Sequence, residues 1–169
     1  MLHWVFDLDY TLYSLPKHIP FGYDKLHLDP ELKRSINSLP GRKAIFTNGT
    51  RQHAYNSVVA MGLEQVFHSI EGRDSVDGLK PDPHVYYKFI QKNQIEVGDK
   101  ILFFEDTLSN LQTAKEFGWI TVYIKGDSSS YQRPQQLQRP QRPHHPRGVD
   151  FSFSNITEAL EYFNHHMET

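Results

Sequence analysis

Short apolar runs alternate with longer amphipathic stretches along this chain of 169 residues. Short runs rich in β-branched and aromatic residues are typical of buried strands, whereas apolar residues spaced three and four apart predict helices. The pattern predicts strands at 2–8, 43–47, 65–70, 100–105, 120–125 and 149–153. Amphipathic stretches lie between most of these strands and after the last one, so strands and helices are expected to alternate.

Residues that favour helix ends mark the predicted helices. A Ser, Thr, Asp or Asn side chain before a helix can accept a hydrogen bond from its first turn, and glycine favours the position after its end. The candidate N-terminal caps are Asp29, Thr50, Asp82 and Asn155, and two predicted helices are followed by Gly62 and Gly118.

The predicted strands are continuous apolar runs rather than alternating apolar and polar positions. This pattern, with helices between the strands, indicates a parallel sheet covered by helices on both faces. We therefore predict an α/β fold, a three-layer sandwich with a Rossmann-like parallel sheet. A chain of this length is expected to form a single domain, residues 1–169, that buries roughly two thirds of its unfolded surface.

Residues 127–148 interrupt this alternation between the fifth and sixth predicted strands. The segment is rich in Pro, Gln and Arg and has almost no apolar residue, so we interpret it as a mobile insertion that cannot pack a core. Its arginines could contact nucleic acid or an anionic protein, and residues 140–143 could bind as a PxxP ligand. The favoured interpretation is a surface loop that is tolerated without a function.

Composition excludes several classes of protein. The formal net charge of −2 gives the whole chain no bias toward a polyanionic partner. The chain has no cysteine, which excludes a disulfide framework, a thiolate zinc site and a cysteine nucleophile, and we expect a cytoplasmic location. The first apolar run is short and ends in Asp7, so neither a signal peptide nor a membrane span is expected.

Polar residues stand at the ends of four predicted strands. Active sites of parallel α/β sheets lie at the carboxyl ends of the strands, where such side chains would meet. These residues are Asp7 and Asp9 at the first strand, Thr47 and Asn48 at the second, Lys80 in the loop after the third, and Glu105 and Asp106 at the fourth. The sequence therefore predicts a single site at this rim of the sheet.

The carboxylates of this rim suit a hard divalent cation. Magnesium takes oxygen ligands and typically binds one or two carboxylates together with a substrate phosphate. Asp7 and Asp106 are the expected direct ligands, with the backbone carbonyl of Asp9 as another, and Glu105 could ligate directly or through water. We therefore expect Mg²⁺ as the cofactor.

The same residues suit phosphoryl transfer. A carboxylate beside a metal can act as a nucleophile and form an acyl-phosphate, and a second carboxylate, here Asp9, could exchange protons with the leaving oxygen. A phosphoryl group in transfer carries charge on its equatorial oxygens and needs donors around it. Thr47, Lys80 and the backbone N–H of Asn48 are donors of the right kinds.

Four motifs resemble those of one enzyme family, in the same order. FDLDYTLY resembles the DxDxT motif of the haloacid dehalogenase superfamily phosphatases, FTNGT the second motif, LKPDP the third and FFEDTLSN the fourth. The stretches LDPEL, LPGRKAIFTN and KPDPHVY further resemble the pyrimidine 5′-nucleotidase-like branch. The resemblance covers nearly all of the chain to about residue 125, and the ordered set is far more specific than any single motif.

The resemblance implies a division of roles. Asp7 would be the nucleophile and a magnesium ligand, and Asp9 the general acid and base, with its carbonyl on the metal. Thr47 and Lys80 would hold the phosphoryl oxygens, with Lys80 also steadying the nucleophile. The metal site would be completed by Asp106 with support from Glu105, and Thr11 and Asn110 are expected to brace the loops.

The chain departs from the family pattern between the first two motifs. Members of the nucleotidase-like branch usually carry a large helical cap there, but only about forty residues separate Asp9 from Asn48, and residues 14–28 are too few for a helical bundle. The fold is therefore expected to be capless or minimally capped, with an open site. Such a site favours a phosphate on a larger molecule, or a lid supplied by a second copy of the chain. The expected substrate is a phosphorylated small molecule or a phosphorylated macromolecule.

Two other functions remain open. The same nucleophile could pass its phosphoryl group to an acceptor, as in a phosphotransferase or mutase, or the fold could serve as a non-catalytic binding protein.

His53 stands near the predicted rim, and a surface role is favoured for it over a contact with substrate.

Overall fold

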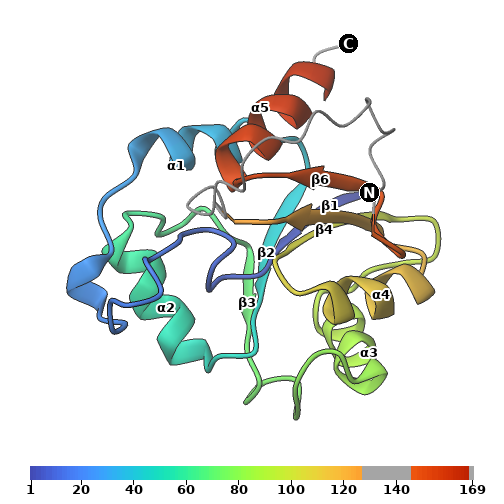
Figure 1. The fold of residues 1–169 in the computed structure, drawn as a ribbon. Coiled ribbons are helices and arrows are strands. Elements are labelled where there is room, and N and C mark those ends of the chain that lie inside the picture. The colour runs from blue at the N-terminus through green and yellow to red at the C-terminus, as the bar shows by residue number, and fades with distance from the viewer. Residues whose placement is uncertain (127–145, 168–169) are drawn as a thin grey trace, which may run out of the picture.

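The computed structural model describes residues 1–126 and 146–167. Its strands and helices alternate along the chain, and most of the predicted insertion, residues 127–145, lies outside the described residues (Figure 1). The elements are β1 (Leu2–Phe6), the 3₁₀ helix η1 (Tyr23–Lys25), α1 (Pro30–Asn37), β2 (Arg42–Phe46), α2 (Arg51–Ala60), β3 (Ser69–Glu71), α3 (Pro83–Lys92), β4 (Lys100–Glu105), α4 (Leu108–Glu116), β5 (Ile120–Ile124), β6 (Phe151–Phe153) and α5 (Ile156–Met167).

The strands form one sheet in the order β3-β2-β1-β4-β5-β6, and every neighbouring pair is parallel. Figure 1 shows α1 and α5 above the sheet and α3 and α4 below it. The predicted three-layer α/β sandwich with a Rossmann-like parallel sheet is thereby confirmed. The strand order places β1 near the middle of the sheet, with β2 on one side and β4 on the other.

Both faces of the sheet are buried against helices, which explains the continuous apolar runs. In β1 successive side chains point to opposite faces, so Trp4 and Phe6 lie in one core and Val5 in the other. The first core includes apolar residues of α1, α2 and α5, and the second includes those of α3 and α4. Ring stacking reinforces both cores, as between Phe6 and Phe104, whose centroids lie 4.7 Å apart.

The predicted helix caps are confirmed. The side-chain oxygens of all four accept hydrogen bonds from backbone N–H groups two or three residues later, over 2.9–3.1 Å. These caps are Asp29, Thr50, Asp82 and Asn155.

The predicted strand at 65–70 is wrong in most of its length, because β3 pairs only from Ser69 to Glu71. Gln65 has a φ of 65°, and the N–H of Val66 donates to the carbonyl of Leu63, so this stretch is a turn. Val66 is nevertheless buried in the first core, which also contains residues of α2. The apolar side chain of Val66 indicates that this position is buried, and a residue in a turn can be buried as well as one in a strand.

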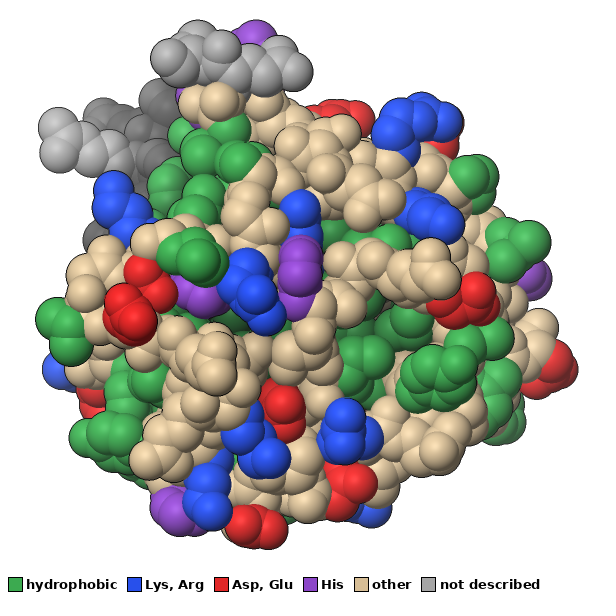
Figure 2. Space-filling view, turned by 180° about the vertical axis from the view of Figure 1, so that it is seen from behind, with side chains coloured by type: hydrophobic (Ala, Val, Ile, Leu, Met, Phe, Trp, Pro, Cys, Tyr) green, Lys and Arg blue, Asp and Glu red, His purple; other side chains and the backbone are tan. Residues whose placement is uncertain are grey.

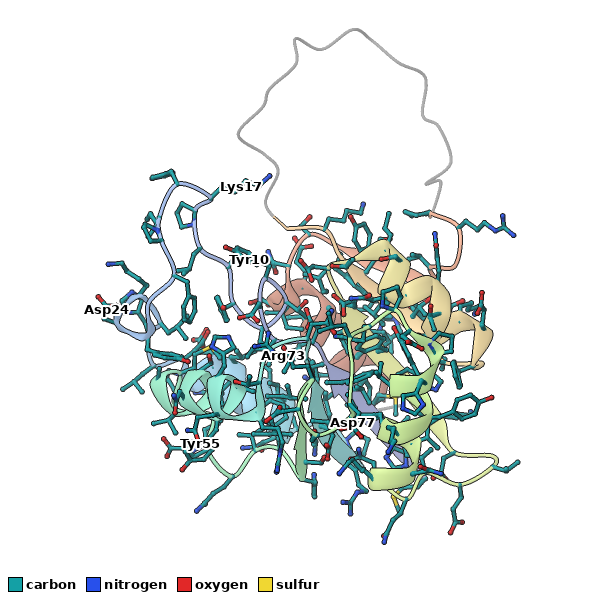
Figure 3. The ribbon with its side chains drawn as sticks, turned by 90° about the horizontal axis from the view of Figure 1, so that it is seen from below. Tyr10, Lys17, Asp24, Tyr55, Arg73 and Asp77 are labelled. Atoms are coloured by element: carbon teal, nitrogen blue, oxygen red, sulfur yellow. The ribbon has the colours of Figure 1, made fainter. Side chains whose placement is uncertain are left out.

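Residues 14–28 contain one short regular element, η1, and no bundle of helices, as the sequence predicts. Figure 3 shows this segment, with Lys17 and Asp24 on it, standing beside α2, the helix that carries Tyr55. The face of the molecule in Figure 2 has basic and acidic side chains interspersed rather than gathered by sign. In the described ranges we find no helix that combines the length and apolar character needed to cross a bilayer.

The aromatic core makes a first prediction. Phe104 is fully buried and contacts the rings of Trp4, Phe6 and Phe163. Phe104→Ala should lower the free energy of unfolding by about 3–5 kcal/mol, because it leaves a cavity in a packed core. Urea titration measures this change. Val97→Ala, at a fully exposed position, is the control and should change stability by less than about 0.5 kcal/mol. Equal effects of the two substitutions would contradict the packing described.

Candidate active site

Asp7 lies at the carboxyl end of the central strand β1. Its backbone N–H donates to the carbonyl of Phe104 in β4 (2.9 Å), which continues the ladder by one residue. On the other side, Thr47 follows β2, and its N–H donates to the carbonyl of Glu71 (3.0 Å). The predicted polar residues of β1, β2 and β4 therefore meet at one rim of the sheet.

Lys80 reaches this rim from the loop between β3 and α3. Its ammonium is buried and lies 3.2 Å from Asp7 Oδ1, 2.8 Å from Glu105 Oε2 and 2.6 Å from the carbonyl oxygen of Phe46. One cation thus binds groups from the ends of β1, β2 and β4. The arrangement holds the carboxylate of Asp7 in place.

Asn48 ties the loop of Lys80 to the end of β2. Its side-chain oxygen accepts from the N–H of Lys80 (2.8 Å), and its side-chain NH₂ donates to the carbonyl of the same residue (3.1 Å). Thr47 is almost fully buried, and its hydroxyl oxygen accepts from the N–H of Gly49 (3.0 Å). The Asn48 side chain therefore has a bracing function that the sequence does not reveal.

Two further side chains orient the carboxylates. Thr11 Oγ1 donates to Asp7 Oδ2 (3.0 Å), and Asn110 Nδ2 donates to Glu105 Oε2 (3.2 Å). Asp7 therefore has a donor on each oxygen, Lys80 on one and Thr11 on the other.

Asp7, Glu105 and Asp106 form an acidic cluster in which one oxygen of each lies within 4.8 Å of the others. Three carboxylates face one ammonium, that of Lys80, so the cluster carries excess negative charge that a divalent cation would balance. The donor set is all oxygen, which suits magnesium.

Within this cluster Glu105 differs from the two aspartates. Its Oε1 accepts from the backbone N–H groups of Asp106 (3.0 Å) and Thr107 (3.1 Å), and its Oε2 accepts from Lys80 and Asn110. Each oxygen of Glu105 thus accepts two hydrogen bonds, whereas each oxygen of Asp7 accepts one and keeps more acceptor capacity for a metal. The geometry therefore favours a supporting position for Glu105.

Burial dominates the electrostatics of the site. It raises the pKa of Asp7 to about 7, against the opposing effect of Lys80 and with a further increase from Glu105. Burial also raises the pKa of Glu105 and of Asp106. Burial alone would lower the pKa of Lys80, but the carboxylates of Asp7 and Glu105 raise it, so the ammonium stays charged.

Asp9 lies beside this cluster and not within it. Its side chain is about one third exposed, and its Oδ1 accepts from the hydroxyl of Tyr13 and pairs with His53 Nε2 (2.9 Å). Burial and the Asp9 carboxylate raise the pKa of Tyr13, so its hydroxyl stays protonated as the donor. The structure therefore separates the two aspartates of the first motif into different environments.

His53 is a site neighbour that the sequence does not identify. It is expected on the surface, but its ring turns from the first turn of α2 toward Asp9 and is only partly exposed. The contact joins residues 44 positions apart. The available sequence signal was its place one turn after the second motif.

A sequence model described as haloacid dehalogenase-like hydrolase matches residues 24–124, which is more than half of the chain. The chain belongs to the haloacid dehalogenase-like hydrolases. The matched range contains Thr47, Lys80 and Asp106, whereas Asp7 and Asp9 precede it. The predicted superfamily is confirmed, and the nucleotidase-like branch stays a prediction.

Curated relatives of this hydrolase match over part of their length. The phosphorylated carbohydrates phosphatase of Thermotoga maritima is 29% identical over 98 residues, 56% of this chain and 45% of that protein. Bifunctional epoxide hydrolase 2 of Rattus norvegicus is 25% identical over 97 residues, 57% of this chain and 17% of that protein. The matches thus span less than half the length of these two relatives.

Solved structures of similar fold include the L-2-haloacid dehalogenase from Xanthobacter autotrophicus with chloropropionic acid covalently bound. It has a TM-score of 0.61 and 18% identity, over 83% of this chain and 62% of that chain. An uncharacterized protein from Listeria monocytogenes serotype 4b has a TM-score of 0.64 and 16% identity, with 100% of both chains covered. At these identities the likeness shows the fold alone.

The raised pKa of Asp7 predicts how the stability of this hydrolase changes with pH in the presence of a chelator. Asp7 binds its proton more tightly in the folded protein than at its ordinary pKa of 3.8. Its contribution to stability is therefore full below pH 3.8 and is lost as pH rises through about 7. Asp7→Asn should flatten the decline over this range by up to about 1.4 kcal/mol per pH unit.

Urea titrations at a series of pH values measure this effect. Asp24→Asn is the matched control, because the Asp24 carboxylate is exposed at the surface and pairs with the exposed Lys25. If Asp7→Asn and Asp24→Asn gave the same pH dependence, burial of the Asp7 charge would not be the cause.

Proposed function

We propose that this chain is a magnesium-dependent phosphatase that hydrolyses a phosphomonoester through an aspartyl-phosphate on Asp7. The observation that carries the proposal is the difference between Asp7 and Asp9 in burial and in hydrogen-bond partners. Asp7 is buried and has a donor on each oxygen, Lys80 and Thr11, whereas Asp9 lies outside the carboxylate cluster and reaches solvent. A nucleophile and a proton carrier need these two different environments.

The first step would form a bond between a carboxylate oxygen of Asp7 and phosphorus while the bond from phosphorus to the leaving oxygen breaks. Asp9 would give its proton to that oxygen. In the second step Asp9 would take a proton from water as the water oxygen attacks phosphorus, which releases phosphate and restores Asp7. Thr47 and the backbone N–H of Asn48 would bind the phosphoryl oxygens, and Lys80 would join them by exchanging one of its three present acceptors for a phosphoryl oxygen.

The magnesium ion would be held by Asp7, Asp106 and the backbone carbonyl of Asp9, with Glu105 in support. The donor set and its excess negative charge favour this ion. When bound, it would neutralise charge on the phosphoryl oxygens. Asp7 would then react as the carboxylate.

Dehalogenation, the activity for which several proteins of similar fold are named, fits these residues less well. A halide leaves without a proton, so a general acid at the position of Asp9 would have no proton to transfer. A haloacid is itself a carboxylate, and the cluster of Asp7, Glu105 and Asp106 would repel it. The phosphatase from Thermotoga maritima, at 29% identity, adds support for phosphate chemistry.

A nucleotide-like substrate is the finer proposal. Aromatic rings form a cluster beside Asp9, with contacting centroids 5.1–6.2 Å apart. A flat leaving group such as a nucleoside could stack on them. The rings are those of Tyr10, Tyr13, Phe21, Tyr23 and His53. A phosphorylated macromolecule and a lid from a second copy remain compatible with the short segment 14–28.

Transfer of the phosphoryl group to an acceptor other than water, as in a phosphotransferase or mutase, is the second candidate. Asp9 reaches solvent, which favours hydrolysis.

We further propose that the protein acts in the cytoplasm, where a chain without cysteine needs no oxidising environment.

Substitution of Asp7 tests the proposed function. With Mg²⁺, the protein should release inorganic phosphate from 4-nitrophenyl phosphate, and Asp7→Asn should lower kcat by a factor of about 10³ or more, because the nucleophile is lost. A parallel panel of nucleotides, sugar phosphates and phosphopeptides should rank the substrates. Asp24→Asn is the control and should keep full activity.

Unchanged turnover in Asp7→Asn would refute the mechanism, and phosphate recovered on an added alcohol instead of free in solution would favour the transferase. Failure to hydrolyse any member of the panel would favour a non-catalytic binding protein.

A further inference from the structure

Asp9 is linked to the segment of residues 14–28 by a chain of hydrogen bonds. Its Oδ1 pairs with His53 Nε2 (2.9 Å), and His53 Nδ1 pairs with the hydroxyl of Tyr23 (2.9 Å). Tyr23 belongs to η1, and His53 to the first turn of α2. Two elements outside the four motifs therefore converge on the proposed proton carrier.

The chemistry of the three groups fixes the direction of these bonds. Oδ1 of Asp9 accepts here, and the proton that Asp9 gives up as an acid would sit on its other oxygen, Oδ2, so His53 Nε2 carries the hydrogen and donates to Oδ1. In the neutral ring Nδ1 is then the acceptor, and the Tyr23 hydroxyl donates to it. Tyr23 thus selects the tautomer of His53 that can donate to Asp9.

Packing holds the His53 ring at this angle. The ring of Phe21 meets it edge-on, with centroids 5.1 Å apart, and meets the ring of Tyr23 at 5.2 Å. The backbone N–H of His53 donates to Thr50 Oγ1 (3.1 Å), which fixes the first turn of α2. Both the backbone and the ring of His53 are therefore restrained.

We propose that His53 is a positioning residue that holds the Asp9 carboxylate toward the leaving oxygen, and that Tyr23 fixes His53 in this role. The proposal rests on the phosphatase activity proposed above. Without His53, Oδ1 of Asp9 would keep the Tyr13 hydroxyl alone, and this partly exposed side chain would rotate more freely. Proton transfer to the leaving group depends on this alignment.

Leaving-group dependence separates positioning from a merely structural role. Phenyl phosphate and 4-nitrophenyl phosphate have similar shapes, but phenolate is a much poorer leaving group and depends more on the acid. The value of kcat/KM reports the first phosphoryl transfer, in which Asp9 acts as the acid. A structural defect would lower kcat/KM for both substrates by the same factor.

The experiment compares the wild type with His53→Ala, His53→Gln and Tyr23→Phe on both substrates in the presence of Mg²⁺. His53→Ala should lower kcat/KM about 10–100-fold for phenyl phosphate and less than about threefold for 4-nitrophenyl phosphate. The larger loss stays below the roughly 10²–10⁴-fold that a general acid contributes, because Asp9 itself is retained. His53→Gln should recover part of the loss, because its amide N–H can donate to Asp9. Tyr23→Phe should give a smaller selective loss.

Tyr55→Phe is the matched control, since Tyr55 lies on the same helix and is 55% exposed. It should leave both values unchanged. Equal losses for the two substrates in His53→Ala, or no loss, would overturn the positioning role while leaving the phosphatase activity intact. Absence of turnover in the wild type would instead overturn the proposed function, and the positioning role with it.

Discussion

The ammonium of Lys80, buried between two carboxylates, is the interaction on which the rest of the site depends. An unpaired charge at this depth would cost several kcal/mol, and removal of either partner would leave an uncompensated charge. The pairing with Asp7 and Glu105 therefore fixes the loop after β3 against the ends of β1 and β4. It also leaves the acidic cluster with more negative than positive charge, which is the condition that a divalent cation relieves.

Strand order explains why these groups meet. The sheet places β1 between β2 and β4, so the residues after three neighbouring strands share one rim. Burial on both faces of the sheet makes that rim rigid. Two hydrogen bonds from the Asn48 side chain to the backbone of Lys80 hold the loop of Lys80 against this rim. Asp9 is held differently, by His53 and Tyr13 from less regular parts of the chain. Asp7, the proposed nucleophile, is thus positioned by the core, and Asp9, the proposed proton carrier, by the segments around it.

Much of this arrangement could be predicted from the sequence, because apolar runs reveal buried strands and parallel strands deliver their ends to one edge. The position of Asp7 follows from that reasoning alone. The contact between His53 and Asp9 does not, since it depends on the angle at which α2 leaves the sheet. The strand predicted at 65–70 is wrong before Ser69 because Val66 is buried in a turn, and hydrophobicity measures burial rather than backbone pairing.

The most direct test of the central claim is to trap the phosphoryl group on the protein. The hydrolase would be mixed with 4-nitrophenyl phosphate and Mg²⁺, quenched with acid within one turnover, and digested for peptide mass spectrometry. We expect one phosphoryl group on the carboxylate of Asp7, and none in the Asp7→Asn variant. Turnover with no phosphorylated Asp7 at any quench time, or with the group on another residue, would contradict the aspartyl-phosphate mechanism.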